Sequence, residues 1–476
     1  RYDVFRDELY FIVCGRHPQF GYADQPPLVP LLAAAFYGLG HQTWLLRFPV
    51  IVAAVLLVFL TVRFVRLLGG GNAAAAAAGI AAATAPELMG MFSTFNTTVF
   101  EPLAWTAIAY LLTRAALLGD RRGLLWSGVI GGLALEAKYS LSLWLIALLV
   151  GVVLTPQRRL LAYRELWIGI AIMVVIAIPS VLWQAANGWP FMALMHAAAD
   201  KNAEIRLGSW IVNQILVQNP LFAPLWIAAL IVPFVRHDLA VVRFLPIAYV
   251  VVTVLTIAGH GKDYYVAAAY PPLFAIGGVA FERLVRNATA RAVYLGLAVV
   301  NAAVIAPMAV PILPPSQIQA YMQRLHVAPQ RQEKGEEGSA LPQEFADQLG
   351  WRDFVREVAD AYRAVPTADR AQTSILVGNY GEAAAIDVYG GAYGLPPALS
   401  GHNQYGLWGL RGQHPANVLR VQHHVERLRP YCRDVRILGT TLSPYAMAYE
   451  NGMTIAWCRS VTPKLATLWP RLQFFE

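Results

Sequence analysis

Long apolar runs alternate with short polar segments over the first two thirds of the chain. A helix that crosses a bilayer needs about 20 mostly apolar residues. Prolines are tolerated inside such helices where neighbouring helices satisfy the freed backbone groups. We therefore predict about ten transmembrane helices, of which the fourth and fifth are short and could form one broken hairpin. The predicted spans are 44–68, 73–91, 99–118, 124–135, 140–155, 166–186, 210–235, 239–258, 266–284 and 292–312.

Arginines gather in every second polar segment between these runs. Such segments face the cytoplasm in membrane proteins, so the alternate segments and the C-terminal region are expected on the opposite, outer side. This alternation also places residue 1 outside, which predicts one more helix upstream of it. The arginines that set the orientation include Arg63, Arg66, Arg121, Arg158, Arg236 and Arg286.

The pattern changes after residue 312. Residues 313–344 are polar and punctuated by Pro and Gly, which is typical of a linker or an irregular loop. Residues 345–476 have the pattern of a small α/β domain. Phe345, Leu349, Phe354 and Val358 have helical spacing, and "TSILVGNYGEAAAIDVYG" predicts a buried strand, a turn and a helix. "VRILGTT" and "MTIAWCRSV" are further strand candidates.

Composition supports a membrane protein, because 57% of the residues are hydrophobic and only 14% are charged. Soluble domains carry about 25% charged residues. The net charge of +8 does not indicate nucleic-acid binding, since no basic run is interleaved with aromatic residues. Cys432 and Cys458 lie in the outward domain, where disulfides persist, and either pair or remain separate core residues. Cys14 fits an apolar helix face, and no cysteine–histidine spacing resembles a zinc site.

The most unusual segment is the first, residues 1–43, with "VFRDELYFIVCGRHPQFGYADQPPLVPLL". It places Asp7, Glu8 and Asp24 before an apolar run, and we predict an outer loop of amphipathic helices folded back on the membrane. A charge at membrane depth costs about 2.5–3.5 kcal/mol on insertion scales, so such groups tend to line functional cavities. On the same face the sequence places Asn96, Glu101, Glu136, Lys138 and Lys262.

Acids beside ammonium groups at one face suit a particular reaction. A carboxylate takes the proton from an acceptor hydroxyl, while a lysine neutralises the phosphate of a departing lipid. The lipid tail would lie between the helices, which explains why this chemistry needs a membrane protein.

Six segments of the chain form a recognisable set: "FRDELYFIVCGRH", "GYADQPPLVPLL", "FSTFNTTVFEPLAW", "LALEAKYS", "GKDYYVAAAYP" and "GNYGEAAAIDVYG…GLPPALSGHNQYGLWG". Together they resemble bacterial glycosyltransferase family 39, which has the GT-C fold and includes relatives of the protein O-mannosyltransferases and of the lipid A aminoarabinose transferase. The resemblance implies a polytopic α-helical membrane protein with a C-terminal extracytoplasmic α/β domain, in the cytoplasmic (inner) membrane of a bacterium. It implies inverting transfer of a sugar from a polyprenyl-phosphate donor to a hydroxyl of a lipid, glycan or protein.

The resemblance also assigns roles to residues. Asp7 matches the presumed general base, with Glu8 as its partner, and Asp24 matches the acid of the second loop motif. Gln25 stands where a lysine follows that acid in the lipid A enzymes, which weakens phosphate binding by this loop. The remaining candidates for substrate binding are Lys138 and Lys262 near the donor phosphate, Tyr264 and Tyr265 in the donor groove, and Asn96 and Glu101.

Simpler roles remain open for the same residues. Asp24 could cap the following helix, Lys138 could reach the membrane interface from the end of a span, and Lys262 could form a surface ion pair with Asp263. Glu101 could pair with a lysine or with Arg47, and Tyr264 and Tyr265 also suit an interfacial aromatic belt. The acids leave room for a divalent metal ion, but no ligand set is identifiable.

Two alternatives compete with a transferase. A transporter or lipid flippase would use the acids as a coupling site, but it would place them near the middle of the bilayer, and the sequence shows no inverted repeat. A membrane scaffold that only binds a partner leaves the acidic pair and the "GKDYY" segment unexplained.

Overall fold

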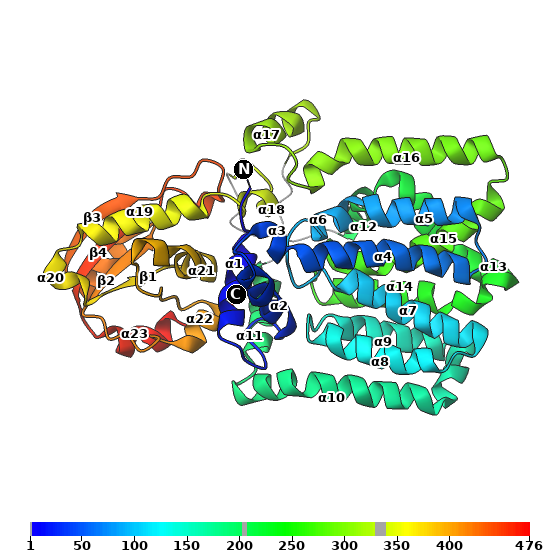
Figure 1. Ribbon diagram of the computed structural model, residues 1–476, viewed down its shortest axis with the longest axis horizontal. Helices are drawn as coiled ribbons and strands as arrows, with labels where there is room; N and C mark the ends of the chain where they lie inside the picture. Colours follow the sequence, from blue (N-terminus) through cyan, green and yellow to red (C-terminus); the bar gives the residue numbers. More distant parts are fainter. Residues whose placement is uncertain (1, 202–206, 329–338) are drawn as a thin grey trace.

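The structure is a computed structural model that describes residues 2–201, 207–328 and 339–476. It is elongated, with the C-terminal domain at one end, a helical bundle at the other and the N-terminal helices between them (Figure 1). Residues 329–338 of the predicted linker lie outside the described residues.

Each predicted apolar run forms helix, but several helices are shorter than a full span. Within the described ranges four helical segments are long and apolar enough to cross a membrane, 48–67, 164–186, 263–284 and 288–309, or six if two bent pairs each count as one span. The bundle contains α4 (Phe48–Leu67), α5 (Asn72–Thr84), α6 (Pro86–Met91), α7 (Glu101–Leu118), α8 (Arg122–Leu135), α9 (Leu141–Val153), η1 (Pro156–Ala162), α10 (Arg164–Ala186), α11 (Pro190–Lys201), α12 (Leu207–Val217), η2 (Pro220–Phe222), α13 (Ala223–Val235), η3 (His237–Val242), α14 (Phe244–Ala258), η4 (Asp263–Ala269), α15 (Tyr270–Leu284) and α16 (Ala288–Ala309).

Two of the predicted spans are broken. The run 73–91 divides into α5 and α6 at Ala85, because Pro86 disfavours a helical conformation in the residue before it. The run 210–235 bends by 88° between α12 and α13, where Asn219 and Pro220 interrupt the helix. The bundle itself packs through small residues, as membrane helices do: a Cβ added at Gly128 would lie 2.0 Å from the carbonyl oxygen of Gly169.

The N-terminal segment forms α1 (Arg6–Arg16), α2 (Leu28–Gly38) and α3 (Thr43–Leu46). The predicted amphipathic character is wrong for α1, because every residue from Glu8 to Cys14 is buried. Apolar side chains of α1 share one core with α2 and with the C-terminal domain. Cys14 is a buried free cysteine in this core, as predicted.

The C-terminal domain contains a four-stranded sheet of order β1-β2-β4-β3, with β1 and β2 parallel and the other neighbours antiparallel. Ile375 and Leu419 share a core with α19 and α21, whereas Leu376 and Val418 pack with residues of α23. The elements are α18 (Gln343–Ala346), α19 (Trp351–Ala364), α20 (Thr367–Arg370), β1 (Thr373–Leu376), α21 (Tyr380–Tyr389), η5 (Gly390–Tyr393), α22 (Asn403–Trp408), β2 (Asn417–Gln422), η6 (Val425–Tyr431), β3 (Cys432–Thr440), η7 (Ala448–Glu450), β4 (Thr454–Val461) and α23 (Leu465–Leu472).

The structure corrects three details of this region. The predicted helix from Phe345 is interrupted at Gly350, whose φ of 86° is outside the helical range. The segment after residue 312 is not wholly irregular, because α17 (Pro315–Arg324) forms there and packs Ile318 against the C-terminal domain. Strand β2 was not predicted.

Of the two alternatives for Cys432 and Cys458, the structure has the disulfide, which joins β3 to β4.

Candidate active site

The two acids of α1 have opposite environments. Glu8 is fully buried and accepts hydrogen bonds from the backbone N–H groups of Phe5 (2.7 Å) and Phe95 (2.6 Å). It also accepts two from the Arg47 guanidinium, at 2.7 and 2.9 Å. Asp7, one residue earlier, has a side chain 30% exposed. Glu8 therefore fixes α1 to the bundle, and Asp7 faces accessible space.

A tyrosine of the C-terminal domain holds Asp7. The hydroxyl of Tyr380 donates a hydrogen bond to Oδ1 of Asp7 at 2.8 Å, and Nε of Arg6 lies 3.5 Å from the same oxygen. No described residue donates a hydrogen bond to the other oxygen, Oδ2. Asp7 thus keeps one oxygen available for a substrate hydroxyl.

Asp24 lies in the loop between α1 and α2. Oδ1 accepts a hydrogen bond from the hydroxyl of Tyr10 at 2.9 Å, and the side-chain amide of Asn403 lies 3.4 Å from Oδ2. Burial raises the pKa of Asp24 to about 7, and the nearby charge of Asp7 acts in the same direction. Asp24 does not cap α2, whose N-cap residue is Pro27 and has no side-chain cap.

Two tyrosines whose tilted rings pack against each other connect these acids. The hydroxyl of Tyr10 binds Asp24, and the hydroxyl of Tyr380 binds Asp7. The centres of the two tyrosine rings lie 4.6 Å apart. The C-terminal domain also fixes the Asp24 loop, because the side chain of Gln404 accepts a hydrogen bond from the Ala23 N–H at 2.9 Å.

The predicted lysines and tyrosines form a second cluster. Lys138 pairs with the buried Glu101 at 3.4 Å, and its ammonium group lies 5.2 Å from the ring centre of Tyr265. The ring of Tyr265 packs edge-on against that of Tyr264 at 4.8 Å, and the ammonium of Lys262 lies 6.0 Å from the Tyr264 ring centre. The sequence left either a lysine or Arg47 as the partner of Glu101, and in the structure the partner is Lys138. Lys262 and Asp263 are both buried, so they are not a surface ion pair.

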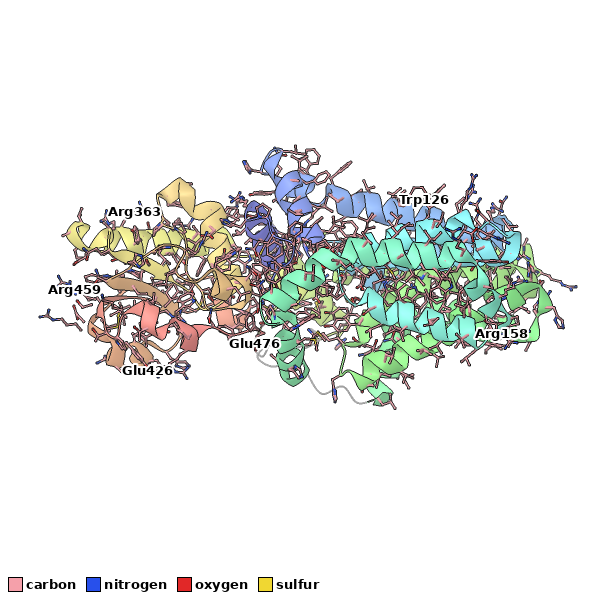
Figure 2. All side chains as sticks on the ribbon, turned by 90° about the horizontal axis from the view of Figure 1, so that it is seen from below. Trp126, Arg158, Arg363, Glu426, Arg459 and Glu476 are labelled. Atoms are coloured by element: carbon pink, nitrogen blue, oxygen red, sulfur yellow. A yellow bond between two sulfur atoms is a disulfide. The ribbon has the colours of Figure 1, made fainter. Side chains whose placement is uncertain are left out.

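Short stretches of backbone bring the two clusters to the same end of the bundle. The N–H of Leu28, four residues after Asp24, donates to the carbonyl of Glu136, two residues before Lys138. The Phe95 N–H that binds Glu8 lies six residues before Glu101. Arg158 is at the opposite end of the bundle, far from the C-terminal domain (Figure 2). The acids therefore lie at one end of the helices. This position suits a transferase, whereas a transporter would place its coupling site near the middle of the bilayer.

The side chains of the two remaining predicted residues, Asn96 and Gln25, differ in their hydrogen bonding. The amide of Asn96 donates to the carbonyl of Met91 at 3.0 Å, and its oxygen accepts from the N–H of Thr98 at 2.9 Å, so this side chain shapes its own loop. Gln25 is 2% exposed, and neither polar atom of its side chain has a hydrogen-bond partner among the described residues. A buried amide without partners is costly.

Metal binding finds no support in the observed geometry. The described ranges hold no group of three or more His, Cys, Asp or Glu side chains that could bind a metal ion. Hydroxyl groups of tyrosine bind both Asp7 and Asp24 instead.

Sequence reasoning missed Tyr10, Tyr380 and Gln404, and it assigned no role to Asn403. Tyr10 follows Asp7 by three residues in a helix, which places both on one face, but its hydroxyl binds Asp24 in the following loop, and no local spacing indicates that contact. Tyr380 lies within the quoted "GNYGE" segment, but nothing in the sequence indicates its contact with Asp7.

Comparisons with known proteins agree with this geometry. Residues 24–183, about a third of the chain, match the family described as dolichyl-phosphate-mannose-protein mannosyltransferase. No curated protein matches the chain. The crystal structure of ArnT from Cupriavidus metallidurans bound to undecaprenyl phosphate is similar to this fold, with a TM-score of 0.60, 14% identity, and coverage of 96% of this chain and 94% of that chain. The apo form of the same protein has a TM-score of 0.56 with the same identity and coverage.

Fold and family match together point to one class, the multi-pass membrane glycosyltransferases: the chain has the fold of ArnT, and about a third of it matches a mannosyltransferase family. Residues 24–183 carry the signature of the dolichyl-phosphate-mannose-protein mannosyltransferase family. The predicted family resemblance, fold class and enzyme class are thus confirmed.

Proposed function

We propose that this protein transfers a sugar from a polyprenyl-phosphate carrier to a hydroxyl of a lipid, glycan or protein acceptor. The supporting observation is that Asp7, with one open oxygen, lies at the same end of the bundle as the paired lysines. The carrier tail would lie among the apolar helices, as undecaprenyl phosphate is bound by the similar ArnT.

Asp7 is the general base of the proposed reaction. The acceptor oxygen attacks the anomeric carbon from the side opposite the phosphate, and the bond between that carbon and the phosphate oxygen breaks. The configuration is inverted, the acceptor proton passes to Oδ2 of Asp7, and the carrier leaves as polyprenyl phosphate. No covalent sugar–enzyme intermediate is required.

Lys138 and Lys262 stabilise the departing phosphate. Negative charge develops on the leaving group in the transition state, and fixed cations near it lower the barrier. Glu101 orients Lys138, and Tyr264 and Tyr265 separate the two ammonium groups and form a wall of the donor site.

Asp24 and Gln25 suit the sugar. Asp24 has a pKa of about 7 and so exchanges its proton near neutral pH, which is the range that favours acid–base catalysis. The unpartnered amide of Gln25 both donates and accepts, as recognition of sugar hydroxyls requires. Glu8, with four donors, acts by holding α1 in place.

The arginine distribution orients the enzyme. Arg158 and the other arginine-rich loops mark the cytoplasmic side, so the site and the C-terminal domain face outward across a bacterial cytoplasmic membrane. A lipid-linked donor is needed there because nucleotide sugars are confined to the cytoplasm.

The test compares lipids and surface glycans by mass spectrometry in cells that lack the protein and cells that carry variants of it. We expect wild-type protein and the distant surface variant Asp434→Asn to restore a glycosylated product. Asp7→Asn should not restore it, although the variant reaches the membrane in normal amount. Full product with Asp7→Asn would refute the proposed mechanism.

A further inference from the structure

We propose that Tyr380 of the C-terminal domain is a positioning residue for Asp7, so that this domain completes the catalytic site. This inference rests on the proposed role of Asp7 as the base. It assigns a function to the C-terminal domain through Tyr380, which lies 373 residues from Asp7 in sequence.

Local structure places Tyr380 at the first position of α21. Strand β1 ends at Leu376, and the side chain of Asn379 caps the helix by accepting a hydrogen bond from the Glu382 N–H at 3.0 Å. Gly381 then allows α21 to press against α1, because a Cβ there would lie 2.4 Å from Cγ of Arg6. The Tyr380 hydroxyl therefore reaches Asp7 across a direct contact between the two helices.

The hydrogen bond fixes the direction of the Asp7 carboxylate. Burial raises the pKa of Tyr380 well above its usual value. The phenol therefore stays protonated, and its O–H group donates a hydrogen bond to Oδ1 of Asp7. Both helix N-termini that meet here favour a carboxylate. Without the bond, Asp7 would be free to turn toward Arg6, whose Nε is only 3.5 Å away, and Oδ2 would lose its orientation toward the acceptor.

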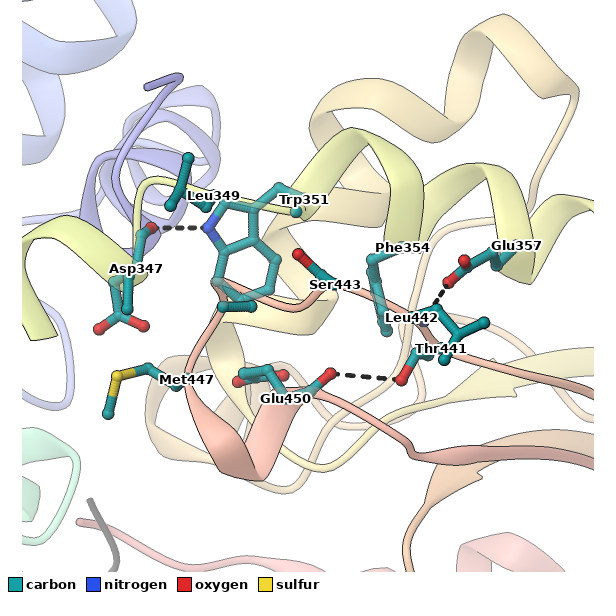
Figure 3. A pocket seen from close by; sticks show the side chains of 13 residues that line it. Asp347, Leu349, Trp351, Phe354, Glu357, Thr441, Leu442, Ser443, Met447 and Glu450 are labelled. Carbon is teal, nitrogen blue, oxygen red and sulfur yellow. Dashed lines mark hydrogen bonds between the residues drawn. The ribbon is translucent and has the colours of Figure 1, made fainter. Parts of the chain in front are cut away.

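Arg6 also contacts groups other than Asp7. Its Nη1 lies 3.6 Å from Asp347 and 2.5 Å from the hydroxyl of Tyr449, and its guanidinium lies 5.4 Å from the Tyr380 ring centre. Asp347 lines a small pocket together with Glu450 and Trp351 (Figure 3). These anchors leave Tyr380 as the only described hydrogen-bond donor to Asp7.

Tyr380 also couples the two acids. Its ring packs on that of Tyr10, whose hydroxyl donates to Asp24 and accepts from the Gln404 N–H at 3.2 Å. Since Gln404 and Tyr380 both belong to the C-terminal domain, that domain sets the positions of both carboxylates.

The test is Tyr380→Phe, which removes the hydroxyl and keeps the ring. The matched control is Tyr389→Phe at the other end of α21, because the buried Tyr389 hydroxyl has no hydrogen-bond partner among the described residues. Turnover is measured as undecaprenyl phosphate released from the undecaprenyl-phosphate sugar that the cell comparison identifies.

We expect Tyr380→Phe to lower kcat about tenfold or more, the usual effect of losing a hydrogen bond to a charged group, with little change in KM for the donor. The acid limb of the pH–rate profile should move to higher pH, because the ionised form of Asp7 loses a donor. Tyr389→Phe should match wild type, and Tyr380→Phe should bind undecaprenyl phosphate as wild type does.

Measurements in the Asp7→Asn background separate this inference from the proposed function. We expect Tyr380→Phe to have little further effect on the residual turnover there, because both changes act on one group. An equal loss in both backgrounds, or a wild-type kcat with an unshifted pH profile, would overturn the role of Tyr380. If Asp7→Asn itself kept full turnover, the proposed function would fail instead.

Discussion

Two neighbouring carboxylates on one helix serve different purposes because of the directions in which they point. Successive residues of an α-helix are rotated by about 100°, so Glu8 enters the core while Asp7 reaches its edge. Glu8 gains enough donors to stay buried, which is the condition for a buried charge. The sequence predicted the acidic pair but not which member is open, because that depends on packing against residues far along the chain.

The half-buried loop acid Asp24 gives a pH signature. Its pKa is about 7 in the folded protein and 3.8 in an ordinary environment, so the folded state holds an extra proton between these values. The free energy of unfolding should therefore fall as pH rises from about 4 to 7 and then level off. Asp24→Asn should reduce that fall, as measured by thermal unfolding across the range.

Other buried acids, such as Asp347, change stability with the same sign, so the comparison must be a difference between wild type and variant. Asp434→Asn, at a partly exposed position of β3 beside Arg436, serves as the control and should leave most of the pH dependence unchanged. Identical pH curves for Asp24→Asn and wild type would contradict the raised pKa of Asp24.

At the scale of elements, the site depends on the contact between α1 and α21. Hydrophobic periodicity predicted the existence of helices and strands well, because each element carries its own pattern. The burial of all sides of α1 was not predictable, since a short apolar helix with an acidic start has the same composition whether it lies on a membrane or inside a core. Strand β2 was missed because "NVLRVQ" is short and carries a charge.

Gly381 tests this contact. Gly381→Ala places a methyl group against Cγ of Arg6, near the base of that side chain, so the neighbour cannot simply swing away. Overpacking of this kind typically costs about 1–3 kcal/mol, and it should displace Tyr380 from Asp7. We expect a lower unfolding temperature and a turnover at least as low as that of Tyr380→Phe.

Gly391→Ala is the matched control, because a Cβ at that position meets nothing within 4 Å. It should resemble wild type in both measurements. If Gly381→Ala were as stable and as active as Gly391→Ala, the close approach of the two helices would not position the site.

At the scale of the whole molecule, the protein is a helical bundle and a C-terminal domain that are joined through α1. The sequence predicted the fold class and the family resemblance, because these follow from long apolar runs and from local segments, and the roles of the two lysines stay predictions. It could not predict that Lys138 and Lys262 each lie beside one ring of the Tyr264–Tyr265 pair, or that Tyr380 holds Asp7. The contacts of Lys138 and Tyr380 join residues that lie far apart in the chain, and no local pattern records them.

The most direct test of the account is the affinity of the purified protein in lipid nanodiscs for undecaprenyl phosphate. We predict that the double variant Lys138→Gln/Lys262→Gln binds this lipid at least about tenfold more weakly than wild type, since two charged contacts to the phosphate are lost. The control Lys464→Gln, at an exposed position before α23, should bind as wild type does. A folded double variant with undiminished affinity would contradict a donor-phosphate site at these lysines.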